Sequence, residues 1–150
     1  METRRIFKSL VGEIQVDYKF KSRPKVKIKT SEDAYKEIRS LFKRINYKEE
    51  VYMLLLNRAG NSLGWVKVSE GGIAGTVMDV KIILQHALLA HASSVILAHN
   101  HPSGNLTPSG KDLNTTNRIK KACELLEVSL IDHLIITDDS YYSMADEGCL

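Results

Sequence analysis

The chain has 150 residues, of which 43% are hydrophobic and 26% are charged, a composition typical of one soluble domain with its own core. No apolar run approaches the roughly 20 residues that span a bilayer, and the N-terminal residues lack the apolar stretch of a secretory signal, so we expect a cytoplasmic protein with no membrane partner. Residues 1–50 carry 14 Lys and Arg against 8 Asp and Glu, whereas residues 51–150 carry 7 against 10. The two parts are therefore expected to have different roles.

Basic side chains alternate along the N-terminal part of the chain. They occupy every second position and would point to the same side of an extended segment. The residues are Lys19, Lys21, Arg23, Lys25, Lys27 and Lys29. One interpretation of this basic strip is an edge strand whose solvated lysines prevent edge-to-edge pairing. The alternative is a cationic surface for the phosphates of a nucleic acid or for an acidic partner.

The spacing of apolar residues and the turn signals predict the other elements. A capping pattern at Thr30 and Asp33, followed by an apolar stripe, predicts a helix over residues 30–46. Asp79 can cap a second helix that ends near His91. The remaining predictions are strands over 51–56, 62–68 and 93–98, a helix over 109–127, and strands over 130–137 and 141–144, with a glycine-rich loop at 70–76. From residue 51 onwards this order predicts an α/β fold with a mixed sheet between helices.

Polar residues begin abruptly where the apolar strand over residues 93–98 ends. In open α/β sheets, ligands bind at this end of the strands. His99 and His101 are two residues apart, so both imidazoles face the same side if the strand continues, and Pro102 favours extended geometry at His101. Asn100 is expected to be the outward residue between them. Two imidazoles from one strand end form half of a possible zinc site.

A third ligand is expected from the next helix. Pro108 and Ser109 predict a helix start, which places Asp112 in the first turn, and residues 102–108 are long enough to fold back. Two imidazoles and one carboxylate leave a fourth position open for water, as in catalytic zinc sites. Zinc would lower the pKa of that water to about 7, and a nearby carboxylate off the metal would act as the general base.

Ordinary structural interpretations compete with this metal site. A histidine pair at this spacing can lie on the surface or in the core, and S-x-x-D is also a common helix cap. Three further histidines are interpreted as structural: His86, His91 and His133. The consecutive letters H-N-H spell the name of a nuclease motif, but in that motif the three residues are spread along a ββα unit.

The pattern H-x-H-P, six residues and S-x-x-D resembles the signature of the JAMM (MPN/JAB) metalloprotease family. The longer string HNHPSG…PS..D, with GGIAGTVMD (Gly71 to Asp79) and YYSMADEG (Tyr141 to Gly148) as flanks, is similar to the RadC branch of that family. The similarity covers residues 49–150, and residues 1–48 are expected to form a basic extension that packs on or flanks this domain. The resemblance implies a three-layer α/β/α fold with a mixed β-sheet, like that of cytidine deaminases, and one zinc ion.

The resemblance also implies roles for individual residues. His99, His101 and Asp112 match the zinc ligands, and Ser109 matches a serine that stabilises the oxyanion. The family base is a glutamate at the start of an upstream strand, which Glu50 fits best. Glu49 stays open as the alternative, because a one-residue slip reverses the direction of a side chain, and Glu70 fits less well.

The implied activity is hydrolysis of a peptide or isopeptide bond by metal-activated water, without a covalent intermediate. The alternative function is a DNA-associated, RadC-like module that acts in DNA repair through the basic strip. RadC-type proteins usually carry a helical N-terminal segment that resembles helix-hairpin-helix DNA-binding modules. Residues 1–48 do not show this pattern, which weakens the transfer of DNA binding to this chain.

Overall fold

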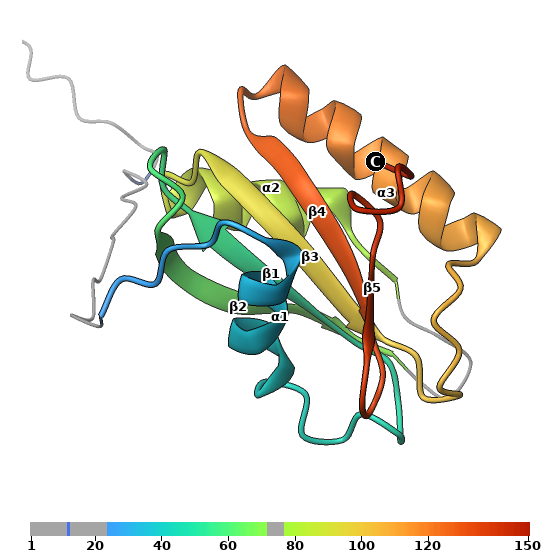
Figure 1. Cartoon of the computed structure of the whole chain (residues 1–150). Helices are drawn as coiled ribbons and strands as arrows, with labels where there is room; N and C mark the ends of the chain where they lie inside the picture. The colour runs from blue at the N-terminus through green and yellow to red at the C-terminus, as the bar shows by residue number, and fades with distance from the viewer. Residues whose placement is uncertain (1–11, 13–23, 72–76) are drawn as a thin grey trace, which may run out of the picture.

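The computed structural model describes residues 12, 24–71 and 77–150 (Figure 1). The elements follow in this order: α1 (Ser31–Arg39), β1 (Glu50–Leu56), β2 (Ser62–Glu70), α2 (Val80–Leu89), β3 (Ser94–Asn100), α3 (Gly110–Leu125), β4 (Ser129–Ile136) and β5 (Tyr141–Ser143). From β1 onwards this is the predicted order. The predicted glycine-rich loop falls mostly on residues 72–76, outside the described residues.

The strands form one mixed sheet in the order β2-β1-β3-β4-β5. β3 and β4 are parallel, and the other neighbouring pairs are antiparallel. Every residue of β1 is buried, so the strand predicted over residues 51–56 is covered on both faces. The parallel arrangement of β3 and β4, with α3 as the connection, brings their carboxyl ends to the same edge of the sheet.

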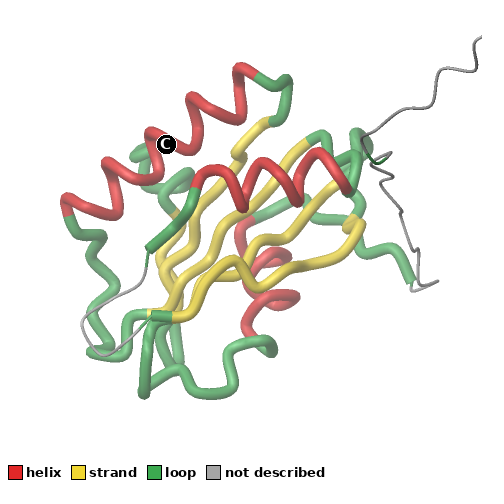
Figure 2. The backbone as a smooth tube through the Cα atoms, turned by 180° about the vertical axis from the view of Figure 1, so that it is seen from behind, coloured by secondary structure: helices red, strands yellow, loops and turns green. Residues whose placement is uncertain are grey.

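Helices cover both faces of the sheet. Figures 1 and 2 show α1 on one face and α2 and α3 on the other. The α1 face holds the apolar cluster with Tyr52 and Leu54 of β1, whereas the face of α2 and α3 holds the cluster with Val51 and Met53. Successive residues of β1 thus alternate between the faces, as a pleated strand requires.

The first helix is shorter than predicted, because α1 ends at Arg39 rather than near residue 46. The predicted capping box is present: Thr30 accepts the N–H of Asp33, and Asp33 accepts the N–H of Thr30. Phe42 and Ile45 belong to the core cluster on the α1 face although they lie outside any helix. The apolar spacing beyond α1 therefore reflects burial against the sheet and not a continued helix.

Part of the basic strip lies within the described residues. Lys25, Lys27 and Lys29 are exposed, whereas Ile28 is buried in the core cluster on the α1 face. Residues 26–28 run along the β1–β2 turn, where the N–H of Ile28 donates to the Gly60 carbonyl at 3.0 Å. This part has the expected alternation. The other three basic residues lie outside the described ones: Lys19, Lys21 and Arg23.

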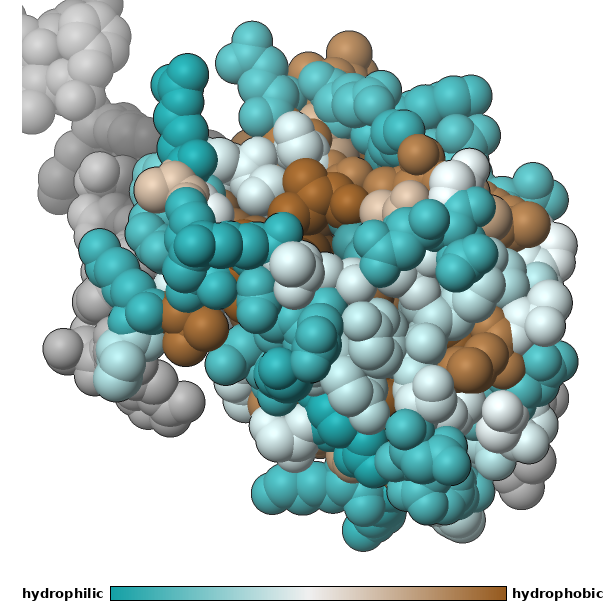
Figure 3. All heavy atoms as spheres, viewed as in Figure 1, coloured by the Kyte–Doolittle hydropathy of each residue, from teal (hydrophilic) through white to brown (hydrophobic). Residues whose placement is uncertain are grey.

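The surface seen from the α1 face is mostly hydrophilic. Figure 3 shows small, separate hydrophobic patches among polar side chains. Among the described residues, no helix is both long enough and apolar enough to cross a membrane. Cys123 is buried in the core, and Cys149 is an exposed free thiol.

Candidate metal centre

Three side chains converge at the carboxyl end of β3. Nε2 of His99 lies 3.0 Å from Nε2 of His101, and each of these nitrogens lies 3.5 Å from a carboxylate oxygen of Asp112. His99 and Asn100 end β3 and His101 follows directly, whereas Asp112 lies in the first turn of α3. The structure thus brings together the three residues that spacing and resemblance single out as ligands.

The helix cap that precedes α3 orients the Asp112 carboxylate. Oδ2 of Asp112 accepts the N–H of Ser109 at 2.7 Å, and Oγ of Ser109 accepts the N–H of Asp112 at 3.0 Å. This capping box is the structural interpretation of S-x-x-D, and it coexists with the cluster because one carboxylate serves both. Ser109 accepts in its bond to Asp112, so that bond does not use its hydroxyl proton.

The geometry of the three residues fits a zinc ion. Ligand atoms that lie about 2.1 Å from a tetrahedral zinc are about 3.4 Å apart, close to the separations of 3.0 and 3.5 Å in the cluster. Nδ1 of His101 lies 2.6 Å from the carbonyl oxygen of Asn105. A carbonyl can only accept, so Nδ1 carries the proton and Nε2 of the neutral ring offers its lone pair to the cluster.

Burial and mutual charge set the protonation states of the cluster. Burial lowers the pKa of His99 from 6.5 to about 4, although the charge of Asp112 opposes this shift. The hydrogen bond with Asp112 raises the pKa of His101. Burial raises the pKa of Asp112, but His101, His99 and Ser109 together hold it well below its usual range. At neutral pH the buried imidazole of His99 is therefore neutral and the carboxylate of Asp112 is ionised, as metal binding requires.

The structure places Glu50 away from this cluster. Val51 pairs with His99, so the preceding residue points to the opposite face, which is the α1 face. There the buried Glu50 carboxylate accepts a hydrogen bond from Nζ of Lys67 at 2.7 Å. Lys67 pairs with Tyr52 of β1, which also lies on the α1 face. The expected position of the Glu50 side chain beside the ligands is therefore corrected.

Glu49 directly precedes β1 and is expected on the same face as the ligands. The alternation of side chains that takes Glu50 to the α1 face returns the residue before it to the face of His99. The bond to Asp112 is the largest cause of the raised pKa of His101, and the negative charge of Glu49 adds to it. Glu70 instead pairs with Lys48 and Lys67, which lower its pKa to about 2. Of the three glutamates considered from the sequence, Glu49 is the one whose charge acts on a cluster residue, His101.

Asn100 is not an outward residue, which corrects a second expectation. It is fully buried, and its Oδ1 accepts the N–H of Glu50 at 2.7 Å. Its Nδ2 donates to the carbonyl oxygens of Ile45 and Lys48 at 2.7 and 2.9 Å. Asn100 therefore ties the segment that carries both glutamates to the end of β3. Its position in a strand buried on both faces is a signal in the sequence, because a buried amide needs partners.

His133 was interpreted from the sequence only as a structural residue, but it is a buried neighbour of the candidate ligand His99. Its Nε2 lies 2.7 Å from Nδ1 of His99, and its Nδ1 lies 2.6 Å from Oγ1 of Thr116. The adjacent Asp132 accepts the N–H of His133 and the hydroxyl of Ser143. The pair Asp132 and His133 inside an apolar strand was the available signal, since buried polar groups need partners.

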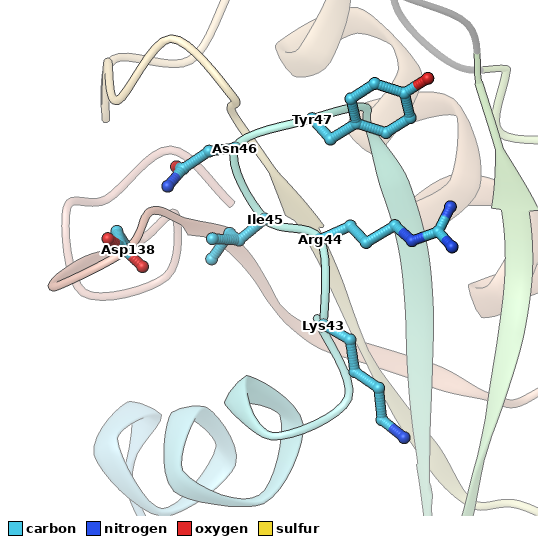
Figure 4. Close-up of a pocket in the computed structure, with 6 residues that line it drawn as sticks. All are labelled: Lys43, Arg44, Ile45, Asn46, Tyr47 and Asp138. Carbon is cyan, nitrogen blue, oxygen red and sulfur yellow. The ribbon is translucent and has the colours of Figure 1, made fainter.

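A shallow hollow lies on the surface near this edge of the sheet, between the turns that precede β1 and the β4–β5 turn. Its lining residues are Lys43, Arg44, Ile45, Asn46, Tyr47 and Asp138. Figure 4 shows Arg44 and Tyr47 on one side of the loop and Asn46 towards Asp138. The lining includes none of the three cluster residues, so the hollow is not the candidate metal centre.

The fold is thus an α/β domain with a mixed sheet, and a His-His-Asp cluster that could hold a metal ion lies at the carboxyl end of a parallel strand. The model of one family, described as the RadC-like JAB domain, matches residues 28–149. The chain belongs to this family.

Relatives of the chain bear the name UPF0758 protein. The chain is 43% identical over 122 residues to one from Flavobacterium johnsoniae, which covers 81% of this chain and 53% of the relative. It is 48% identical over 104 residues to one from Porphyromonas gingivalis, covering 69% and 46% of the two chains. It is 35% identical over 138 residues to one from Aquifex aeolicus, covering 91% and 59%. The chain thus spans about half the length of these relatives.

Proposed function

We propose that the chain is a zinc-dependent hydrolase domain of the JAMM type that cleaves peptide or isopeptide bonds with metal-activated water. The observation that carries the proposal is the convergence of His99, His101 and Asp112 at separations that suit one zinc ion. Helices on both faces of a mixed sheet support the expected cytidine-deaminase-like layering. The cytoplasmic location stays a prediction.

The proposed roles follow from the two faces of the sheet. His99, His101 and Asp112 hold the metal, which when bound supplies a water of lowered pKa and polarises the substrate carbonyl. We propose Glu49, in place of Glu50, as the base that takes the proton from the attacking water and returns it to the leaving amine. The Ser109 hydroxyl donates a hydrogen bond to the developing oxyanion.

Metal analysis tests the site without a known substrate. Protein purified without chelator is expected to hold one zinc per chain by elemental analysis, and Asp112→Ala is expected to hold none. Asp139→Ala is the matched control, because this carboxylate is exposed in the β4–β5 turn. Wild-type protein that is folded but takes up no zinc would contradict the proposal.

A pair of glutamine variants tests the assignment of the base. Glu49→Gln is expected to keep its zinc but to lose cleavage of a mixed peptide and isopeptide library, followed by mass spectrometry. Glu50→Gln is expected to keep both zinc and activity, since this side chain faces Lys67 on the other side of the sheet. Loss of activity in Glu50→Gln alone would return the role to Glu50.

The second candidate function is binding of a nucleic acid through the basic strip. Within the described part of the strip, Lys25, Lys27 and Lys29 are exposed at alternating positions along one extended segment, which favours this function. Binding to a DNA duplex is expected to weaken steeply with salt and to fall in a variant with these three lysines changed to glutamine. Binding that is undetectable or independent of salt would refute this function.

A further inference from the structure

The hydrogen bonds behind His99 run in one direction. Oγ1 of Thr116 donates to the main-chain carbonyl of Asp112 at 2.7 Å. A carbonyl oxygen can only accept, so the single proton of the hydroxyl is committed to Asp112. Nδ1 of His133 lies 2.6 Å from the same hydroxyl oxygen, so Nδ1 must be the donor of that bond. The proton of neutral His133 therefore lies on Nδ1.

The same logic continues from His133 to the candidate ligand. His133 is fully buried, and both of its ring nitrogens contact uncharged groups, so a charged ring would be costly there. Its Nε2 is therefore an acceptor, and Nδ1 of His99, 2.7 Å away, must donate to it. This leaves the lone pair of His99 on Nε2, the atom that lies 3.0 Å from Nε2 of His101.

We propose that Thr116 and His133 are positioning residues that set the tautomer of His99, so that Nε2 presents its lone pair to the metal. The inference deepens the proposed function and rests on it for the identity of the bound metal. We call His99, His133 and Thr116 the buried relay. The relay begins at the main chain of one ligand, Asp112, and ends at the ring of another, so it couples α3 to β3 through β4.

The relay depends on the hydroxyl group that α3 supplies at residue 116. Thr116 is buried and lies one turn after Asp112, so its hydroxyl reaches the Asp112 carbonyl in the usual manner of a helical threonine. Without the hydroxyl, Nδ1 of His133 has no acceptor and the ring can carry its proton on Nε2 instead. That tautomer would donate to Nδ1 of His99 and move the proton of His99 to Nε2, where it competes with a metal.

Thr116→Val tests the relay, because valine keeps the branched shape and removes only the hydroxyl. Thr116→Ser retains the hydroxyl, and Thr137→Val removes another buried threonine hydroxyl, which bonds the Ser140 carbonyl outside the relay. Ring nitrogen chemical shifts, measured by NMR on metal-free protein labelled with ¹⁵N, report the tautomer of each histidine. Competition with a chromophoric chelator reports the zinc affinity.

We expect His99 and His133 of the wild type to carry their protons on Nδ1, and His99 of Thr116→Val to carry it on Nε2. Zinc affinity is expected to fall by about 10–100-fold in Thr116→Val. Thr116→Ser and Thr137→Val are expected to bind zinc like the wild type, although Thr137→Val loses stability. A merely structural role of Thr116 would lower stability without changing the tautomer.

Two results would overturn the inference. One is a wild-type His99 that carries its proton on Nε2, and the other is a folded Thr116→Val variant with unchanged tautomers and zinc affinity. The tautomers are read in metal-free protein, so they stand apart from the proposed function. A protein with the expected tautomers but no zinc uptake would refute the zinc hydrolase and leave the arrangement of the relay intact.

Discussion

Asn100→Asp tests how the segment before β1 is held, because the substitution keeps the shape of the side chain and reverses the polarity at one atom. Oδ1 can still accept the N–H of Glu50. The atom that replaces Nδ2 lies where the amide donates to the carbonyl oxygens of Ile45 and Lys48, at 2.7 and 2.9 Å. An ionised carboxylate there would face two acceptors in a buried place, so the variant side chain is expected to take up a proton.

The cost of this substitution follows from the proton and the hydrogen bonds. An aspartate with an ordinary pKa of about 3.9 needs about 4 kcal/mol to take up a proton at pH 7. The protonated acid can donate to only one of the two carbonyls, and the lost bond adds about 1 kcal/mol. We therefore expect Asn100→Asp to lower the free energy of unfolding by about 5 kcal/mol at pH 7.

The pH dependence separates this mechanism from simple loss of packing. The pKa of the variant carboxyl is raised in the folded state, so the folded protein binds more protons than the unfolded chain and gains stability as the pH falls. Urea denaturation at pH 7, 6 and 5 is expected to show a loss, relative to wild type, that shrinks by about 1.4 kcal/mol per pH unit. Asn57→Asp is the control, since its side-chain oxygen accepts two turn N–H groups, as a carboxylate also can. A small loss that is independent of pH would refute the reasoning.

Three further predictions concern stability. The pKa of His99 is about 4 in the fold against 6.5 ordinarily, so between these two pH values the unfolded chain binds more protons than the folded protein. The free energy of unfolding of metal-free protein, measured with urea, should therefore fall by up to about 3 kcal/mol as the pH is lowered through this range. A free energy that stays constant would contradict this prediction. Lys67→Met leaves the Glu50 carboxylate buried without its ammonium partner and should cost about 3 kcal/mol, most of it recovered in the double variant with Glu50→Gln. Ile38→Ala in α1 should cost about 2–5 kcal/mol in thermal unfolding, unlike the exposed control Lys36→Ala, and a neutral effect would show that α1 is not part of the cooperative core.

Features that depend on neighbouring residues were predicted well. The order of elements from β1 onwards, the caps at Thr30 and Asp79, and the S-x-x-D box all follow from patterns a few residues long. The convergence of His99, His101 and Asp112 was also predictable, because both histidines lie at one strand end and Asp112 follows after a short loop. Local spacing nearly determines the positions of such groups.

Features that depend on distant partners were missed. The burial of Asn100 depends on carbonyl groups more than fifty residues earlier in the chain, to which its side chain donates. The role of His133 depends on Thr116 and His99, which lie in two other elements. The choice between Glu49 and Glu50 depends on the pairing of β1 with β3, and an apolar run buried on both faces has no alternation from which that pairing could be read.

Side chains at the end of β3 alternate between the two faces of the sheet, and the two faces have different roles. His99 and His101 face the candidate metal, and Asn100 between them holds the segment before β1 from the other face. β1 and β4 flank β3. Glu49 directly precedes β1, and His133 lies within β4. A slip of β1 by one residue would exchange Glu49 for Glu50 without changing either side chain. The Asn100 hydrogen bonds oppose that slip. In the proposed mechanism they keep the base in position, and the buried relay keeps the ligand His99 in the tautomer that can bind the metal.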